Sequence, residues 1–127
     1  PLYDSLHDLF NYDKIQRKIE SGEIEIAPLA FMRGRTLKNS FAILDEAQNT
    51  TIPKRKMFLT RMGFVSKMVM TGDITQIDLP KPSQSGLLDA KKILDNIEQI
   101  NFCELDSRDI VRHQLVKKIV SAYDQAK

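Results

Sequence analysis

The stretch Phe41-Ala42-Ile43-Leu44-Asp45-Glu46-Ala47-Gln48 decides the fold, because four apolar residues run directly into two carboxylates. A continuous apolar run of this kind predicts a strand that is buried on both of its faces. Lys67 to Thr71 predicts a second such strand, which runs into Gly72 and Asp73. Helical patterns alternate with these short strands, and this order predicts an α/β fold with a mostly parallel sheet.

Helices are predicted where apolar residues recur at helical spacing. The first runs from residue 13 to 21 and stops at Gly22, and the next lies between its cap Thr51 and Gly63, which closes it. Another covers the apolar residues between 87 and 97. The chain ends in an amphipathic helix with an apolar face formed by Leu115, Ile119 and Tyr123.

Two further strands are predicted from shorter patterns. Residues 23–27 alternate polar and apolar side chains, and Pro28 ends the run. Residues 100–105 form another apolar segment, in which Cys103 is expected to be a small core residue rather than a nucleophile. A single cysteine excludes an internal disulfide and suits a reducing compartment.

The composition is that of a globular chain of one domain, with 127 residues, 42% hydrophobic and 28% charged. The net charge of +2 does not by itself favour nucleic-acid binding. No stretch is long and apolar enough to span a bilayer, and no signal segment opens the chain. Because the chain begins at Pro1 without a methionine, we expect it to be a piece of a longer protein.

Polar side chains follow each predicted strand, at the edge where ligands bind in parallel α/β sheets. Asp45 is suited to hold a hydrated Mg²⁺ ion, and Glu46 is suited to orient or deprotonate an attacking water. Gln76, after the second strand, has an amide that can contact a phosphate oxygen or that water. Further polar residues follow the last predicted strand, from Asp106 to Arg112.

Each of these signals also has an ordinary structural interpretation. Asp45 and Glu46 could be solvated carboxylates at a strand end, and Gly72-Asp73 could be a plain turn. Arg112 has a fork of donors suited to a phosphoryl group, but it could equally be a surface arginine paired with Asp109.

Basic residues form two short clusters whose role stays open. Arg33 and Arg35 flank a glycine and could bind phosphate from a nucleotide, from RNA, or from neither. The second cluster, Lys54 to Lys56, could be either a solvated face or a binding surface.

The phosphate-binding loop of a P-loop protein is missing from the chain. That loop needs two glycines separated by four residues and followed by Lys and Ser or Thr, and no pair among the five glycines has this spacing. Weak or no ATP binding is therefore expected of this chain alone. Two histidines and one cysteine without paired spacing do not support a zinc site or a catalytic triad.

Taken together, several stretches resemble the PhoH family, which consists of predicted cytoplasmic ATPases with a RecA-like core related to superfamily-one helicases. The resemblance extends over nearly the whole chain. It rests on the runs Ile24 to Leu37, Ile43 to Asn49, Lys56 to Arg61, Thr71 to Pro80 and Asp109 to His113.

The resemblance implies a RecA-like three-layer sandwich, with residues 1–127 as one domain that lacks the P-loop strand and its upstream glycine-rich loop. It makes the chain the carboxyl-terminal part of a longer cytoplasmic protein that uses ATP and Mg²⁺. RNA and a homo-oligomeric ring are implied as partners, with no membrane contact.

The resemblance also gives roles to individual residues. Asp45 and Glu46 correspond to the Walker B pair, which serves magnesium binding and water activation. Gln76 corresponds to a phosphate sensor, with Asp73 beside it at the nucleotide. Arg112 corresponds to an arginine that reaches the γ-phosphate. Arg33 or Arg35 would act at the site or at a subunit boundary.

One departure concerns the residues before Lys56, where the family usually has Glu-Gln-Met and this chain has Pro53-Lys54-Arg55. A cation replaces the glutamine amide, so the role of that glutamine is in doubt here. Two functions therefore stay open: a magnesium-dependent nucleoside triphosphatase, or a RecA-like binding and assembly module that does not hydrolyse nucleotide.

Overall fold

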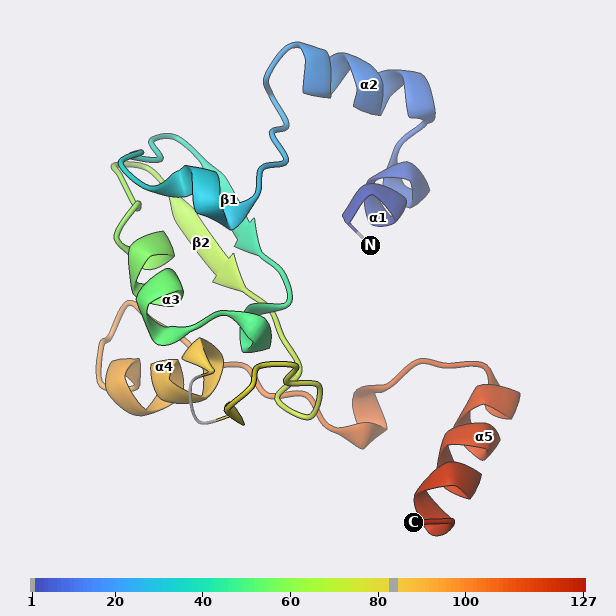
Figure 1. Ribbon diagram of the computed structural model, residues 1–127. Helices are drawn as coiled ribbons and strands as arrows, with labels where there is room; N and C mark the ends of the chain where they lie inside the picture. The colour runs from blue at the N-terminus through green and yellow to red at the C-terminus, as the bar shows by residue number, and fades with distance from the viewer. Residues whose placement is uncertain (1, 83–84) are drawn as a thin grey trace. The chain divides into compact units, whose positions relative to one another are not determined.

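The computed structural model describes residues 2–82 and 85–127, and it divides the chain into two compact units, Pro1–Ala90 and Lys91–Lys127. Figure 1 shows the order of the elements along the chain. They are α1 (Leu2–Leu9), α2 (Tyr12–Glu20), η1 (Leu29–Met32), β1 (Phe41–Leu44), η2 (Ala47–Asn49), α3 (Ile52–Leu59), β2 (Lys67–Met70), α4 (Gly86–Leu94), η4 (Ser107–Asp109) and α5 (Gln114–Gln125).

Strands β1 and β2 pair in parallel, which confirms an α/β fold with parallel strands. The register places Phe41 opposite Lys67 and Leu44 opposite Met70, so both carboxyl ends lie at one edge of the sheet. The predicted second strand reached Thr71, one residue beyond the observed end.

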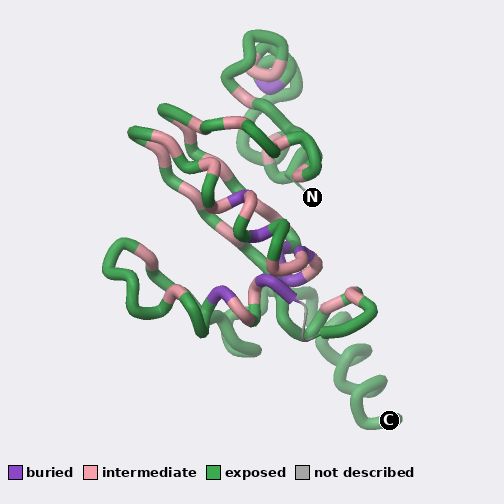
Figure 2. The backbone as a smooth tube through the Cα atoms, turned by 60° about the vertical axis from the view of Figure 1, so that its left-hand side comes forward, coloured by how far each residue is buried: buried purple, intermediate pink, exposed green. Residues whose placement is uncertain are grey.

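The strands are not buried on both faces, and that prediction was wrong. Burial alternates along each strand, with Phe41 65% exposed and Ile43 49% exposed while Ala42 and Leu44 are half-buried. Because neighbouring side chains point to opposite faces, only one face of this pair is covered. Helix α3 lies beside the strands in both views (Figure 1, Figure 2).

Helix α3 begins after Thr51, with Pro53 in its first turn and Phe58 buried, as predicted. The side chain of Thr51, however, makes no capping hydrogen bond. The helix ends at Leu59, so the prediction that Gly63 closes it was wrong. Gly63 instead donates its backbone N–H to the Leu37 carbonyl at 2.8 Å. A Cβ on residue 63 would lie only 2.7 Å from the same carbonyl oxygen, so a glycine is needed at this close approach.

Helix α2 confirms the predicted helix over 13–21. The side chain of Asn11 caps it by accepting from the Lys14 N–H at 2.8 Å, and Ile15 is fully buried. Gly22 follows the end in the left-handed region at φ +81°, where a glycine is favoured. Helix α1, which precedes α2, was not predicted from the sequence.

Residues 23–27 form no strand, so that prediction was wrong. A strand needs a neighbouring backbone, and within the described ranges the sheet contains β1 and β2 alone. The acidic side chains of this segment are used in ion pairs instead. Glu23 meets Lys18 at 2.5 Å, and Glu25 meets Arg35 at 2.8 Å.

Apart from Ile15 in α2, the buried residues of the first unit gather around η2, α3 and the start of α4, as Figure 2 shows. This core is largely polar. Ala47 and Phe58 share it with four buried polar or charged residues, Gln48, Thr50, Arg55 and Ser85. A polar group that is buried without a partner is costly, so the hydrogen bonds of these four residues decide the local structure.

In the second unit, residues 100–105 have no regular structure, so the predicted strand was wrong there too. Cys103 is exposed rather than part of a core, and Leu105 is 78% exposed. Glu104 forms an ion pair with Lys91 instead. The predicted helix over the apolar residues 87–97 exists, but it ends at Leu94, before Ile97.

Helix α5 confirms the predicted amphipathic helix at the end of the chain. His113 caps it, because its Nδ1 accepts the N–H of Leu115 at 3.1 Å. Within residues 2–82 and 85–127, none of the helices has both the length and the apolar character that a membrane crossing requires.

Candidate functional site at the carboxyl ends of the strands

Asp45 and Thr71 come directly after β1 and β2 and meet at the edge of the sheet. The hydroxyl of Thr71 donates to Asp45 Oδ1 at 2.8 Å. A backbone hydrogen bond also links the two segments beyond the ends of the strands, because the Ala47 N–H donates to the Thr71 carbonyl at 2.8 Å. The contact confirms that the residues after the two strands are neighbours, and it fixes the orientation of the Asp45 carboxylate.

Glu46 turns the chain out of the strand direction. Its backbone is left-handed, with φ 55° and ψ 38°, which for a residue other than glycine costs roughly 1 kcal/mol or more. The short helix η2 starts immediately after it. The side chain is exposed, and its Oε2 accepts a hydrogen bond from Gln48 Nε2 at 2.6 Å.

Gln48 is fully buried and connects the two strand ends. Besides donating to Glu46, it accepts the backbone N–H of Asp73 on Oε1 at 3.1 Å. Its own carbonyl accepts the hydroxyl of Ser85 at 2.8 Å. Gln48 is one of the polar residues that follow the first predicted strand, but no role could be assigned to it from the sequence, because nothing in the sequence indicates that this side chain is buried.

Asp73 organises the turn after β2. Its Oδ1 accepts from the N–H of Thr75 at 2.9 Å and from the Thr75 hydroxyl at 2.6 Å. Its Oδ2 accepts from Gln76 Nε2 at 3.2 Å. The structure therefore brings the predicted residues Asp73 and Gln76 into direct contact, with the Gln76 side chain on the surface.

Gly72 permits this arrangement by the absence of a side chain. A Cβ at that position would lie 2.6 Å from Gln48 Oε1 and 2.8 Å from Leu87 Cδ2. A Cβ essentially never comes this close to another heavy atom, so a side chain at residue 72 would force the buried amide of Gln48 to shift.

Arg35 forms a bidentate ion pair with Glu25. Its Nη1 and Nη2 lie 2.8 and 2.9 Å from the two carboxylate oxygens. The hydrogen bonds and charge of Arg35 lower the pKa of Glu25 below its usual 4.5, and Glu25 raises the pKa of Arg35. A phosphate that binds Arg35 has to compete with this carboxylate. Arg33, on the other side of Gly34, is exposed.

Arg112 lies in the second unit, in the segment between η4 and α5, and is exposed. It lines a shallow hollow together with Ser107, Ile110, Lys117 and Asp124. Asp109, the pairing partner considered from the sequence, accepts the N–H of Asp106 at 2.8 Å in the cap of η4.

Arg55 is buried, with 5% of its surface exposed, so for this residue the interpretation as a solvated cluster was wrong. Its Nη1 donates to the Gly86 carbonyl at 3.0 Å and lies 2.8 Å from Asp89 Oδ2. Lys54 and Lys56 on either side are exposed. Arg55 thus ties α3 to the start of α4, whereas Lys54, at the position of the family's glutamine, is exposed.

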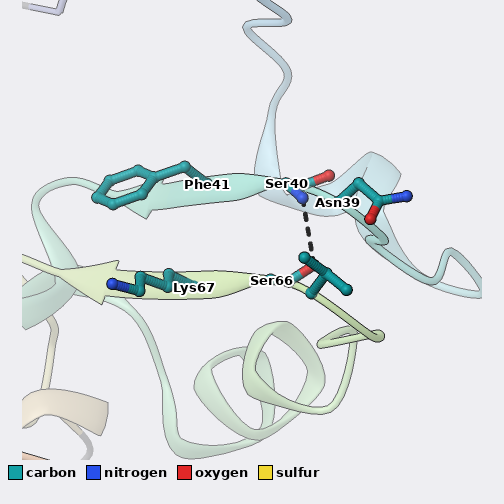
Figure 3. Close-up of a pocket in the computed structure, with 6 residues that line it drawn as sticks. Asn39, Ser40, Phe41, Ser66 and Lys67 are labelled. Atoms are coloured by element: carbon teal, nitrogen blue, oxygen red, sulfur yellow. Dashed lines mark hydrogen bonds between the residues drawn. The ribbon is translucent and has the colours of Figure 1, made fainter.

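A separate hollow lies at the opposite end of the sheet, and Figure 3 shows its lining at the amino ends of the strands. The backbone N–H of Ser40 donates to Ser66 Oγ there at 3.3 Å. Phe41 and Lys67 contribute one apolar and one cationic side chain. Parallel sheets bind ligands at the carboxyl ends of their strands, so Asp45 and its neighbours are the candidate site rather than this hollow.

The donor set at the carboxyl ends fits a magnesium ion that is held mainly through water. Across residues 2–82 and 85–127 there is no group of three or more His, Cys, Asp or Glu placed to hold a metal. Mg²⁺ commonly keeps several waters and takes one or two carboxylates plus phosphate oxygens. Asp45, oriented by Thr71, can supply such a carboxylate.

These features define an α/β protein with a parallel strand pair and a polar cluster at the carboxyl ends of its strands. The family model described as PhoH-like protein matches residues 1–124. The chain belongs to the PhoH family, as the resemblance of its motifs predicted.

Three relatives illustrate the similarity. The chain is 60% identical over 125 residues to a PhoH-like protein of Bacillus subtilis (strain 168), covering 98% of the chain and 39% of the relative. It is 56% identical over 126 residues to a PhoH-like protein of Synechocystis sp., covering 99% and 38%. It is 42% identical over 125 residues to Protein PhoH of Escherichia coli (strain K12), covering 97% and 35%. The chain therefore spans well under half of each of these proteins.

Proposed function

We propose that this chain carries the magnesium- and water-handling part of a nucleoside triphosphatase with a RecA-like P-loop fold, and that ATP is its nucleotide. The observation that carries the proposal is the hydrogen bond from Thr71 to Asp45. It joins the carboxyl ends of two parallel strands and places acidic and amide side chains around one edge, where such sheets bind phosphates.

The proposed roles follow from the chemistry of each side chain. Asp45 holds the hydrated magnesium, which when bound neutralises charge on the phosphate oxygens. Glu46 orients the attacking water and accepts its proton. Gln76 donates its amide to a phosphate oxygen, and Asp73 keeps that amide in place. Arg112, with Arg33 or Arg35, supplies cationic donors to the phosphates.

The phosphate loop in this proposal comes from another part of the full-length protein, because the chain has no glycine pair of the required spacing. RNA binding and assembly into a ring belong to the same proposal. Salt-dependent binding of single-stranded RNA and the mass of the protein in solution test these two parts separately.

The test is ATP hydrolysis by the full-length protein in the presence of Mg²⁺. Glu46→Gln keeps the shape of the side chain but removes the base, so we expect kcat to fall by about 10²–10⁴-fold while ATP still binds. Asp45→Asn is expected to raise the Mg²⁺ concentration needed for half-maximal activity. Glu98→Gln, an exposed carboxylate outside the site, serves as the control.

Absence of magnesium-dependent hydrolysis by the wild type, or full activity of Glu46→Gln, would overturn the proposal. The alternative is a RecA-like binding and assembly module that does not hydrolyse nucleotide. RNA binding that ATP does not affect, together with no hydrolysis, would support that alternative.

A further inference from the structure

We infer that Gln48 is a positioning residue, which holds the carboxylate of Glu46 in place and ties it to the turn that carries Gln76. The inference rests on the proposed function, since it assigns Glu46 the handling of water. It starts from an unusual observation: a glutamine side chain with no exposed surface, placed between an acidic residue and the backbone of a separate turn.

The amide of Gln48 can adopt only one of its two orientations. In the observed one, Nε2 donates to Glu46 Oε2 at 2.6 Å and Oε1 accepts the N–H of Asp73 at 3.1 Å. Rotation of the amide by half a turn would set its N–H groups against the Asp73 N–H and its oxygen against the Glu46 carboxylate. Both contacts would become repulsive, so the two neighbours fix the amide between them.

The backbone that carries Gln48 is fixed as well. The residue before it donates its N–H to the Thr71 carbonyl at 2.8 Å, and the Gln48 carbonyl accepts from buried Ser85. Asn49, the next residue, accepts the N–H of Asp78 on Oδ1 at 2.8 Å. The backbone is therefore held on both sides of Gln48, and the side chain itself can move only by breaking its bonds to Glu46 and Asp73.

The consequence concerns Glu46, which is exposed and has a left-handed backbone. A base acts on a bound water only while its carboxylate stays at hydrogen-bond distance, and a misplacement of about 1 Å can lower a rate by about 10²-fold. Loss of the Gln48 amide therefore acts on turnover. Nucleotide affinity, which comes mostly from the phosphate loop, changes little.

Two substitutions in the full-length protein separate the two bonds. Gln48→Glu keeps an acceptor for the Asp73 N–H but places a carboxylate against Glu46. Gln48→Met keeps the approximate shape and removes both bonds. Asn49→Ala is the matched control, because it removes the side-chain bond that ties the same segment to Asp78. It keeps the backbone N–H that Asn49 donates to the Glu46 carbonyl at 3.0 Å.

Two measurements are needed: the steady-state kinetics of ATP hydrolysis, and hydrogen exchange at the backbone amides of residues 73–78. We expect Gln48→Glu and Gln48→Met to lower kcat by about 10–100-fold, with the KM for ATP within about twofold of wild type. Gln48→Met should also speed exchange at the Asp73 amide, whereas Gln48→Glu should leave it protected. Asn49→Ala should speed exchange at Asp78 and keep kcat within about threefold of wild type.

The inference is overturned if both Gln48 variants retain the kcat of the wild type, or if Asn49→Ala lowers kcat as much as they do. It is also overturned if the exchange rate at Asp73 is the same in wild type and Gln48→Met. Failure of the proposed function looks different, because wild-type protein would then hydrolyse no ATP and Glu46→Gln would have no effect. The exchange rates would still test whether Gln48 holds the turn.

Discussion

Replacement of Arg55 by alanine is expected to destabilise the junction between α3 and α4. The side chain of Arg55 is only 6% exposed. Its guanidinium donates to the Gly86 carbonyl and lies beside the Asp89 carboxylate. Alanine would leave that carbonyl and the Asp89 carboxylate without their cation, and it would open a cavity where the side chain had been.

The magnitude follows from how well the pair is satisfied. Breaking a fully buried ion pair costs about 3–5 kcal/mol. Here the Asp89 side chain is 25% exposed, and neither its Oδ2 nor Arg55 Nε makes a hydrogen bond to any residue within the described ranges. Water reaches the exposed part of the Asp89 side chain and can compensate part of the lost charge, so we expect a loss of about 2–3 kcal/mol for Arg55→Ala.

The assay is urea unfolding, combined with hydrogen exchange that locates the loss at the amides of α3 and α4. The double variant Arg55→Met with Asp89→Leu replaces both charges by apolar groups of similar size. We expect it to lie within about 1 kcal/mol of the wild type. A loss below about 0.5 kcal/mol for Arg55→Ala, or a double variant as unstable as Arg55→Ala, would refute this account of the junction.

Three further outcomes are expected. Thr71→Val removes the donor to Asp45, and should weaken Mg²⁺-dependent activation of ATP hydrolysis by about fivefold, measured by Mg²⁺ titration. Gly72→Ala should destabilise the protein by about 1–3 kcal/mol in urea unfolding, because the new Cβ meets Gln48 Oε1. Glu25 should titrate below 4.5 by NMR and return towards 4.5 in Arg35→Ala. Since the folded-state pKa of Glu25 is lowered, its contribution to stability is present above pH 4.5 and is lost as pH falls through the lowered value.

The elements predicted correctly from the sequence are those whose apolar spacing and end residues can be seen within the element itself. Helix α2 and helix α5 have their own apolar spacing and caps, and β1 and β2 are apolar runs that each end at a turn. The segments 23–27 and 100–105 have similar patterns but no strand. A strand is defined by the backbone beside it, and the alternation of side chains in a single sequence does not reveal whether such a neighbour exists.

At the site, the parallel-sheet rule correctly brought the residues after the two strands together, because it needs only the direction of each strand. It placed Asp45 beside the turn that follows β2, as the Thr71 contact shows. The rule says nothing about which side chain is buried between them. Gln48 and Asp73 are 25 residues apart, and their bond follows from the three-dimensional path of the chain.

The same limitation explains why a cluster of three basic residues was ambiguous. Lys54, Arg55 and Lys56 look alike in charge, but on a helix successive residues point about 100° apart, so a single member can face the core while its neighbours face water. Arg55 faces inward because Gly86, 31 residues later, presents a carbonyl and no side chain at that point. The burial of an ionic residue depends on a partner supplied from elsewhere in the chain, so residue type and charge alone cannot distinguish a structural cation from a solvated one.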